Sequence, residues 1–238
     1  MKTKSLLLSL AFIAFSLMSF NVSAKHIKGS GKVIKETRTA ANFNSIDIGG
    51  AFEIELIKSN EEKVILETDD NIMPHIRVRV VGGELEIDNT EDINNPTELK
   101  VTIYYKEINE LDISGAASLF SADVLESSHL ELDCSGASEI TLKLMVGTME
   151  VDCSGASKLE LEGKADKVEM DLSGASVIRA YGLEINYLDL EASGAAVVKV
   201  LVLDKITIDA SGASSVRYKG SPSIDLLDSS GASSIRKG

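Results

Sequence analysis

The sequence predicts an all-β protein: a single-stranded parallel β-helix, right-handed by the usual crossover chirality, with coils of about 19 residues. Three observations lead to this fold class. The tripeptide Ser-Gly-Ala recurs seven times, and apolar residues alternate with polar ones on both sides of it. Proline is absent between Pro96 and Pro222, so every residue of the repeats keeps an N–H group for strand pairing.

Each Ser-Gly-Ala tripeptide predicts a sharp corner in the chain. Glycine suits a corner that needs a positive φ, and the small residues beside it keep the corner narrow. Coils stacked at the strand spacing of about 4.8 Å would share one continuous core. The tripeptides begin at Ser114, Ser135, Ser154, Ser173, Ser193, Ser211 and Ser230.

The residues around the corners predict two short strands per repeat. Residues two apart lie on the same face of a strand, whereas a helix would need spacings of three and four. A stack of antiparallel hairpins is the rival fold, but the repeats lack the Asn-Gly or Asp-Gly turns that it needs. Apolar residues occupy the third position before each serine (Leu111, Leu132, Val151, Met170, Leu190, Ile208, Leu227) and the fifth position after it (Leu119, Ile140, Leu159, Ile178, Val198, Val216, Ile235).

Upstream of the repeats the pattern continues in altered form. Gly49-Gly50-Ala51 fits a corner, and the stretch from there to Ser114 is long enough for about three further coils. We therefore expect one β-helical domain over residues 25–238, with divergent coils over 25–110 and the seven repeats over 111–238.

A β-hairpin is expected within the divergent coils. Arg77–Val81 and Glu84–Asp88 read as strands on either side of Gly82-Gly83. The following segment, Glu91–Thr97, is rich in Asn and acidic residues and reads as a loop.

Residues 1–24 read as a secretory signal peptide. Lys2 and Lys4 precede an apolar run from Leu6 to Phe20, and Val22-Ser23-Ala24 supplies small residues for cleavage. No later stretch is apolar enough to span a membrane. We expect an exported protein, located in the periplasm, on the outer surface or outside the cell, without membrane insertion.

The charge balance argues against nucleic acid as a partner. Asp and Glu number 37 against 24 Lys and Arg, a net charge of -13, and the chain has no Trp for stacking.

One strand face carries a dense set of carboxylates. Acidic residues stand two before each serine, and in the first five repeats four before it. Two interpretations are open: a solvated face that prevents sideways sheet pairing, or a face that binds Ca2+, the one cofactor the pattern allows. The candidate calcium or cation residues are Asp133, Asp152, Asp171, Glu131, Glu150 and Glu169.

Two further columns follow from the repeat. Cys134 and Cys153 both precede a corner serine, so they should stack within disulfide range, either as a disulfide or as two small buried residues. Six residues after the serine, a basic column comprises Arg179, Lys199, Arg217 and Arg236.

Four stretches together carry a resemblance to a known family: Phe43-Asn44-Ser45-Ile46, the stretch from Gly50 to Leu56, Asn71 to Pro74, and Leu111 to Ser118 leading into the repeats. On these residues the chain resembles the putative auto-transporter adhesin head domain, or GIN domain, family of Bacteroidetes exported proteins. It implies a β-helical exported domain, and it brings no catalytic residues.

Two function classes remain open from the sequence. We expect an exported, non-enzymatic envelope or surface protein, an adhesin or binding module for a glycan or protein ligand. The alternative is a polysaccharide-active β-helix enzyme, a lyase or hydrolase, which rests on fold analogy. The last repeat carries no amphipathic cap after Arg236, so pairing with a second copy through the C-terminal coil is a further expectation.

Overall fold

A computed structural model describes residues 26–238. The signal peptide expected over residues 1–24 lies outside the described residues. Within 26–238, no helix has both the length and the apolar character that a bilayer crossing requires.

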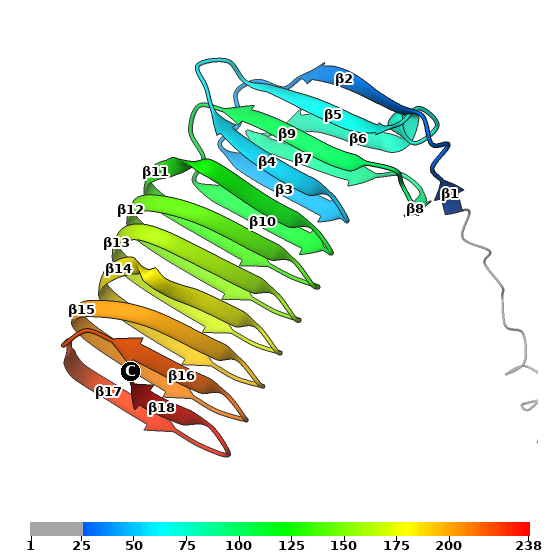
Figure 1. Cartoon of the computed structure of the whole chain (residues 1–238). Helices are drawn as coiled ribbons and strands as arrows, with labels where there is room; N and C mark the ends of the chain where they lie inside the picture. The colour runs from blue at the N-terminus through cyan, green and yellow to red at the C-terminus, as the bar shows by residue number, and fades with distance from the viewer. Residues whose placement is uncertain (1–25) are drawn as a thin grey trace, which may run out of the picture.

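The described chain forms a β-solenoid whose coils lie one on another from a capped end to the last repeat (Figure 1). Neighbouring coils pair through parallel strands. The strands of the coils are β3 (Ser45–Gly50), β4 (Glu53–Lys58), β10 (Glu110–Gly115), β11 (Ser118–Cys134), β12 (Glu139–Cys153), β13 (Lys158–Leu172), β14 (Val177–Ala192), β15 (Val197–Ala210), β16 (Ser215–Lys219), β17 (Ser223–Ser229) and β18 (Ser234–Lys237).

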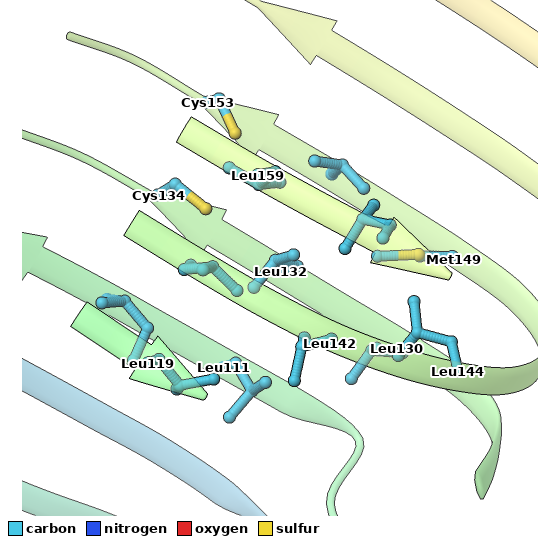
Figure 2. Close-up of a cluster of buried hydrophobic side chains, with 14 of the residues drawn as sticks. Leu111, Leu119, Leu130, Leu132, Cys134, Leu142, Leu144, Met149, Cys153 and Leu159 are labelled. Atoms are coloured by element: carbon cyan, nitrogen blue, oxygen red, sulfur yellow. The ribbon is translucent and has the colours of Figure 1, made fainter. Parts of the chain in front are cut away.

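The core positions expected from the repeat are confirmed. The residues three before and five after the first six corner serines are all buried, and Leu227 and Ile235 of the last repeat are partly buried. In Figure 2, side chains such as Leu132, Leu142 and Met149 project from successive coils into the space between the two strand layers. The core is therefore one unbroken apolar column along the solenoid axis.

Five coils depart from the expectation of two separate short strands. β11 to β15 each run without interruption from one Ser-Gly-Ala corner to the next. The second half of each coil follows inside the same strand, and register shifts lie within β13 between Glu160 and Glu162 and within β14 between Ala180 and Glu184. A β-bulge bends a strand while pairing continues on both sides of it, so no loop is needed.

A cap of mostly antiparallel strands closes the N-terminal end of the stack. β2 pairs antiparallel with β5, β5 with β9, and β6 with β7. The elements of this cap are β1 (His26–Lys28), β2 (Val33–Thr39), β5 (Lys63–Asp69), the 3-10 helix η1 (Met73–His75), β6 (Ile76–Val81), β7 (Glu84–Asn89), β8 (Asp92–Asn94) and β9 (Leu99–Tyr105).

The expected three coils between Gly49 and Ser114 are wrong. Gly49 is the direct register partner of Ser114, so β3 and β4 form the coil next to β10 and β11 on the side of the cap. β7 and β9 pair with the opposite edges of β3 and β4, although they come later in the sequence. The intervening chain therefore builds the cap, because its strands pair across the end of the stack.

The hairpin expected in this region is confirmed. β6 and β7 pair antiparallel around Gly82 and Gly83, whose φ values of 64° and 97° fit a two-residue hairpin turn. The segment expected to be a loop contains β8, which pairs in parallel with β1.

A buried aspartate joins three parts of the cap. The Asp69 side chain accepts hydrogen bonds from the backbone N–H groups of Gly31 and Thr97, both at 2.7 Å, and from the Thr97 hydroxyl at 2.8 Å. Burial alone would raise the pKa of Asp69, and the hydrogen bonds from Thr97 and Gly31 outweigh it, so the pKa is lowered.

The corner glycines meet a second requirement besides positive φ. Gly155 has φ of 79°, and a Cβ added to it would lie closer than 3.0 Å to the carbonyl oxygen of Gly136 in the preceding coil. That oxygen also accepts a 2.7 Å hydrogen bond from the N–H of Ala156. The same hydrogen bond recurs at each of the seven corners, at 2.7 to 2.8 Å.

We expect Gly155→Ala to lower the free energy of unfolding by about 3 kcal/mol, because it adds a steric clash to the strain of a positive φ. Gly82→Ala is the matched control, since Gly82 also has a positive φ but nothing lies within 4 Å of an added Cβ. It should lose only about 1 kcal/mol. Urea unfolding measures both, and equal losses would contradict the role of the close approach.

Candidate functional site

The acidic residues expected on one strand face stand in two rows in register. Asp133 is the direct partner of Asp152, and Asp152 of Asp171. Two residues earlier on the same strands, Glu131 aligns with Glu150 and Glu150 with Glu169. The structure thus brings together all six candidate cation residues.

The aspartate row extends further than the seven repeats. Asp47 is the register partner of Asp112, and Glu86 of β7 is the partner of Asp47 on the other side. The complete row, which we call the carboxylate ladder, comprises Glu86, Asp47, Asp112, Asp133, Asp152, Asp171, Glu191, Asp209 and Asp228.

A shallow groove runs between the carboxylate ladder and the corner serines. One part of it, about 310 Å³ in volume, is lined by Asp133, Asp152 and Asp171 on one side and Ser135 and Ser154 on the other. A second part, of about 340 Å³, continues along the next coils and shares Asp171 with the first. The groove therefore offers a line of carboxylate and hydroxyl oxygens parallel to the solenoid axis.

Close spacing changes the acidity of the ladder. Partial burial, and then the neighbouring carboxylates of Asp152 and Glu131, raise the pKa of Asp133 to about 6. Burial and Glu110 likewise raise the pKa of Asp112. Both shifts arise because removing water and adding nearby like charges disfavour the ionised form.

The described residues contain no preformed metal site that would support the cation hypothesis. Within residues 26–238, no three His, Cys, Asp or Glu side chains are placed to hold one metal ion together. Carboxylates spaced by one strand separation would have to be bridged in pairs from the open side of the groove. Calcium binding at Asp133, Asp152, Asp171, Glu131, Glu150 and Glu169 stays a prediction.

The two cysteines stack under the groove. Cys134 and Cys153 are register partners, and both are buried as free thiols with their sulfur atoms turned inward (Figure 2). A hydrogen bond with Cys153, together with burial, raises the pKa of the Cys134 thiol, so it stays neutral. Their pairing as a disulfide stays a prediction.

Sequence reasoning missed a second serine ladder inside the corner. Four of the serines three after a corner serine are buried and Ser233 is partly buried, and their hydroxyls bond to the backbone or to one another. Ser138 donates to Ser157 at 3.2 Å, and Ser157 to the carbonyl of Ser154 at 3.2 Å. The signal was present, because Ser138, Ser157, Ser176, Ser214 and Ser233 occupy the same repeat position.

A family model described as putative auto-transporter adhesin, head GIN domain, matches residues 42–222. No curated protein matches the chain.

Several solved structures share the fold. A putative adhesin from Bacteroides fragilis is 25% identical with a TM-score of 0.83, over 89% of this chain and 99% of that one. A putative adhesin from Parabacteroides distasonis is 21% identical with a TM-score of 0.72, over 90% and 100%. A putative lipid binding protein from the same species is 19% identical with a TM-score of 0.73, over 90% and 100%.

We expect Asp133→Asn to raise the stability at about pH 7.5 by about 1 kcal/mol, after allowing for solvent screening of the ladder. The folded-state pKa of about 6 lies above the ordinary 3.8, so the proton on Asp133 stabilises the fold fully below about pH 4. This stabilisation is lost as the pH rises through about 6.

Thermal unfolding of both proteins between about pH 4 and pH 7.5 checks the prediction. The advantage of the variant should disappear at the acidic end. Asp204→Asn, at an exposed position of β15, is the control and should leave the profile unchanged. A variant no more stable than the parent at the upper pH would contradict the charge repulsion.

Proposed function

The chain belongs to the family described as putative auto-transporter adhesin, head GIN domain, and from this premise we propose that it is an exported, non-enzymatic binding module of the cell envelope or surface. Its ligand in this proposal is a glycan or a protein. The solved structures that share its fold include proteins described as putative adhesins.

The observation that carries the proposal is the groove beside the carboxylate ladder. Its parts share Asp171 and follow the same corner from coil to coil, so polar groups repeat along one line. A surface with a short regular repeat suits a ligand that is itself regular and extended, since each coil offers the same contacts to successive units. A polysaccharide is such a ligand.

Two further features support binding rather than chemistry. The carboxylates of the groove stand in a row along parallel strands, whereas a glycoside hydrolase needs two carboxyl groups facing each other across the scissile bond. The case for a lyase or hydrolase rests on fold analogy alone, and a fold by itself does not imply a function.

We expect the purified protein to bind selectively to a subset of a glycan array. Alanine substitution of Ser135 and Ser154, which line the groove, should weaken that binding by roughly tenfold by removing hydroxyl contacts. If the protein binds no glycan on the array but captures envelope proteins, the ligand is a protein. Release of product from any glycan would overturn the non-enzymatic assignment.

For calcium, we expect millimolar Ca2+ to raise the melting temperature of the protein, because a cation bridging neighbouring carboxylates relieves their repulsion. The double variant Asp133→Asn with Asp152→Asn should lose this response. A control with the same charge change, Glu107→Gln with Asp204→Asn at exposed positions, should keep it. An unchanged melting temperature in the parent protein would remove Ca2+ from the proposal.

A further inference from the structure

The basic column of the last coils forms a continuous row in the structure. Arg179 is the register partner of Lys199, Lys199 of Arg217, and Arg217 of Arg236. They lie on the strand that follows the corner, six residues after the serine, whereas the carboxylate ladder lies on the strand that precedes it. We call this row the cation ladder.

The cation ladder is open to solvent. Arg179, Arg217 and Arg236 are exposed and Lys199 is half-buried. Val197, two residues before Lys199 on β15, is 38% exposed. Lys219, two residues after Arg217, places its ammonium 4.2 Å from the centre of the Tyr181 ring.

No acidic side chain neutralises the ladder. Among the described residues, none of its four members takes part in an ion pair. Glu160 is the register partner of Arg179 on the preceding coil, and even this pair forms no salt bridge.

This arrangement contrasts with the pairing of charges elsewhere in the protein. Arg77 faces Asp88 across the cap hairpin with a 2.6 Å contact, and Lys158 forms an ion pair with its register partner Glu139. The chain has 37 acidic residues available, yet four cations follow one another at the strand spacing of about 4.8 Å and repel each other. Such a row gains most from an external anion.

We propose that the cation ladder binds an acidic polysaccharide, a linear glycan with carboxylate or sulfate groups, laid along the solenoid axis. This inference rests on the proposed function, since it names the ligand class for the same binding module. The step between successive cations is comparable to the length of one sugar unit in an extended chain. One anionic group per unit or per two units would therefore meet the guanidinium and ammonium groups in sequence.

The other polyanions fit this face less well. An anionic bilayer presents a broad charged plane, but the ladder is one residue wide and belongs to a protein with net charge -13. Single-stranded nucleic acid is bound by aromatic side chains on which successive bases stack. Here Tyr218 is buried, and the Tyr181 ring is already engaged by Lys219.

The test measures binding of the purified protein to polygalacturonate and to dextran sulfate, at low and at physiological salt. The triple variant Arg179→Gln, Lys199→Gln and Arg217→Gln should bind roughly tenfold more weakly than the parent protein. The matched control Lys164→Gln, Lys167→Gln and Lys205→Gln removes the same charge from lysines that already have acidic partners. It should bind like the parent.

Further arms separate the ligand sources. The polymer that binds more tightly shows whether the ladder prefers carboxylate or sulfate groups. Neutral dextran should not bind. Equal binding by the parent and the triple variant overturns the proposal, provided both melt at similar temperatures. Tighter binding to a DNA oligonucleotide or to phosphatidylglycerol vesicles than to both polymers overturns it as well.

The same measurements keep this inference separate from the proposed function. Selective binding of neutral glycans that survives in the triple variant would leave the binding module standing and remove the cation ladder from it. If the parent protein binds neither any glycan nor any envelope protein, the proposed function itself is wrong.

Discussion

The whole architecture depends on one backbone hydrogen bond at each corner. The carbonyl of a corner glycine accepts the N–H of the alanine in the next coil, and the next glycine sits directly against that carbonyl. Any side chain at the glycine would push the two coils apart. Because this contact fixes the coil spacing and the register together, the apolar column of the core and the polar rows of both faces follow from it.

Strict register has an electrostatic consequence. Parallel pairing without slippage places equivalent residues of successive repeats side by side, so like charges become neighbours. The carboxylate ladder and the cation ladder arise in this same way on the two strands that flank the corner. Their repulsion is tolerated because the core and the corner hydrogen bonds hold the coils at fixed spacing. Each ladder then presents one kind of charge along a line, which suits the recognition of extended ligands.

The sequence allowed the repeats to be predicted far better than the cap. The corner glycines and the alternation around them determine coil, core face and register, so the alignment of Asp133 with Asp152 followed directly. The pairing of β7 and β9 with the outer edges of β3 and β4 could not be predicted in this way. A glycine corner at Gly50 is compatible with the next coil joining either edge. The continuous strands were missed because a bulge lets a strand change its register without ending it. The raised pKa of Asp133 and the groove depend on partial burial, which repeat spacing alone does not give.

The order of the coils also separates local from distant strand pairings. β3 and β4 are paired on one side by β7 and β9 and on the other by β10 and β11. The chain must therefore travel outward to complete the terminal layer before it returns to begin the regular stack. These pairings join residues much farther apart in sequence than one repeat, so they are slower to form than the pairings between successive repeats. The contacts of this fold are therefore most local in sequence along the repeats and least local where the cap joins the stack.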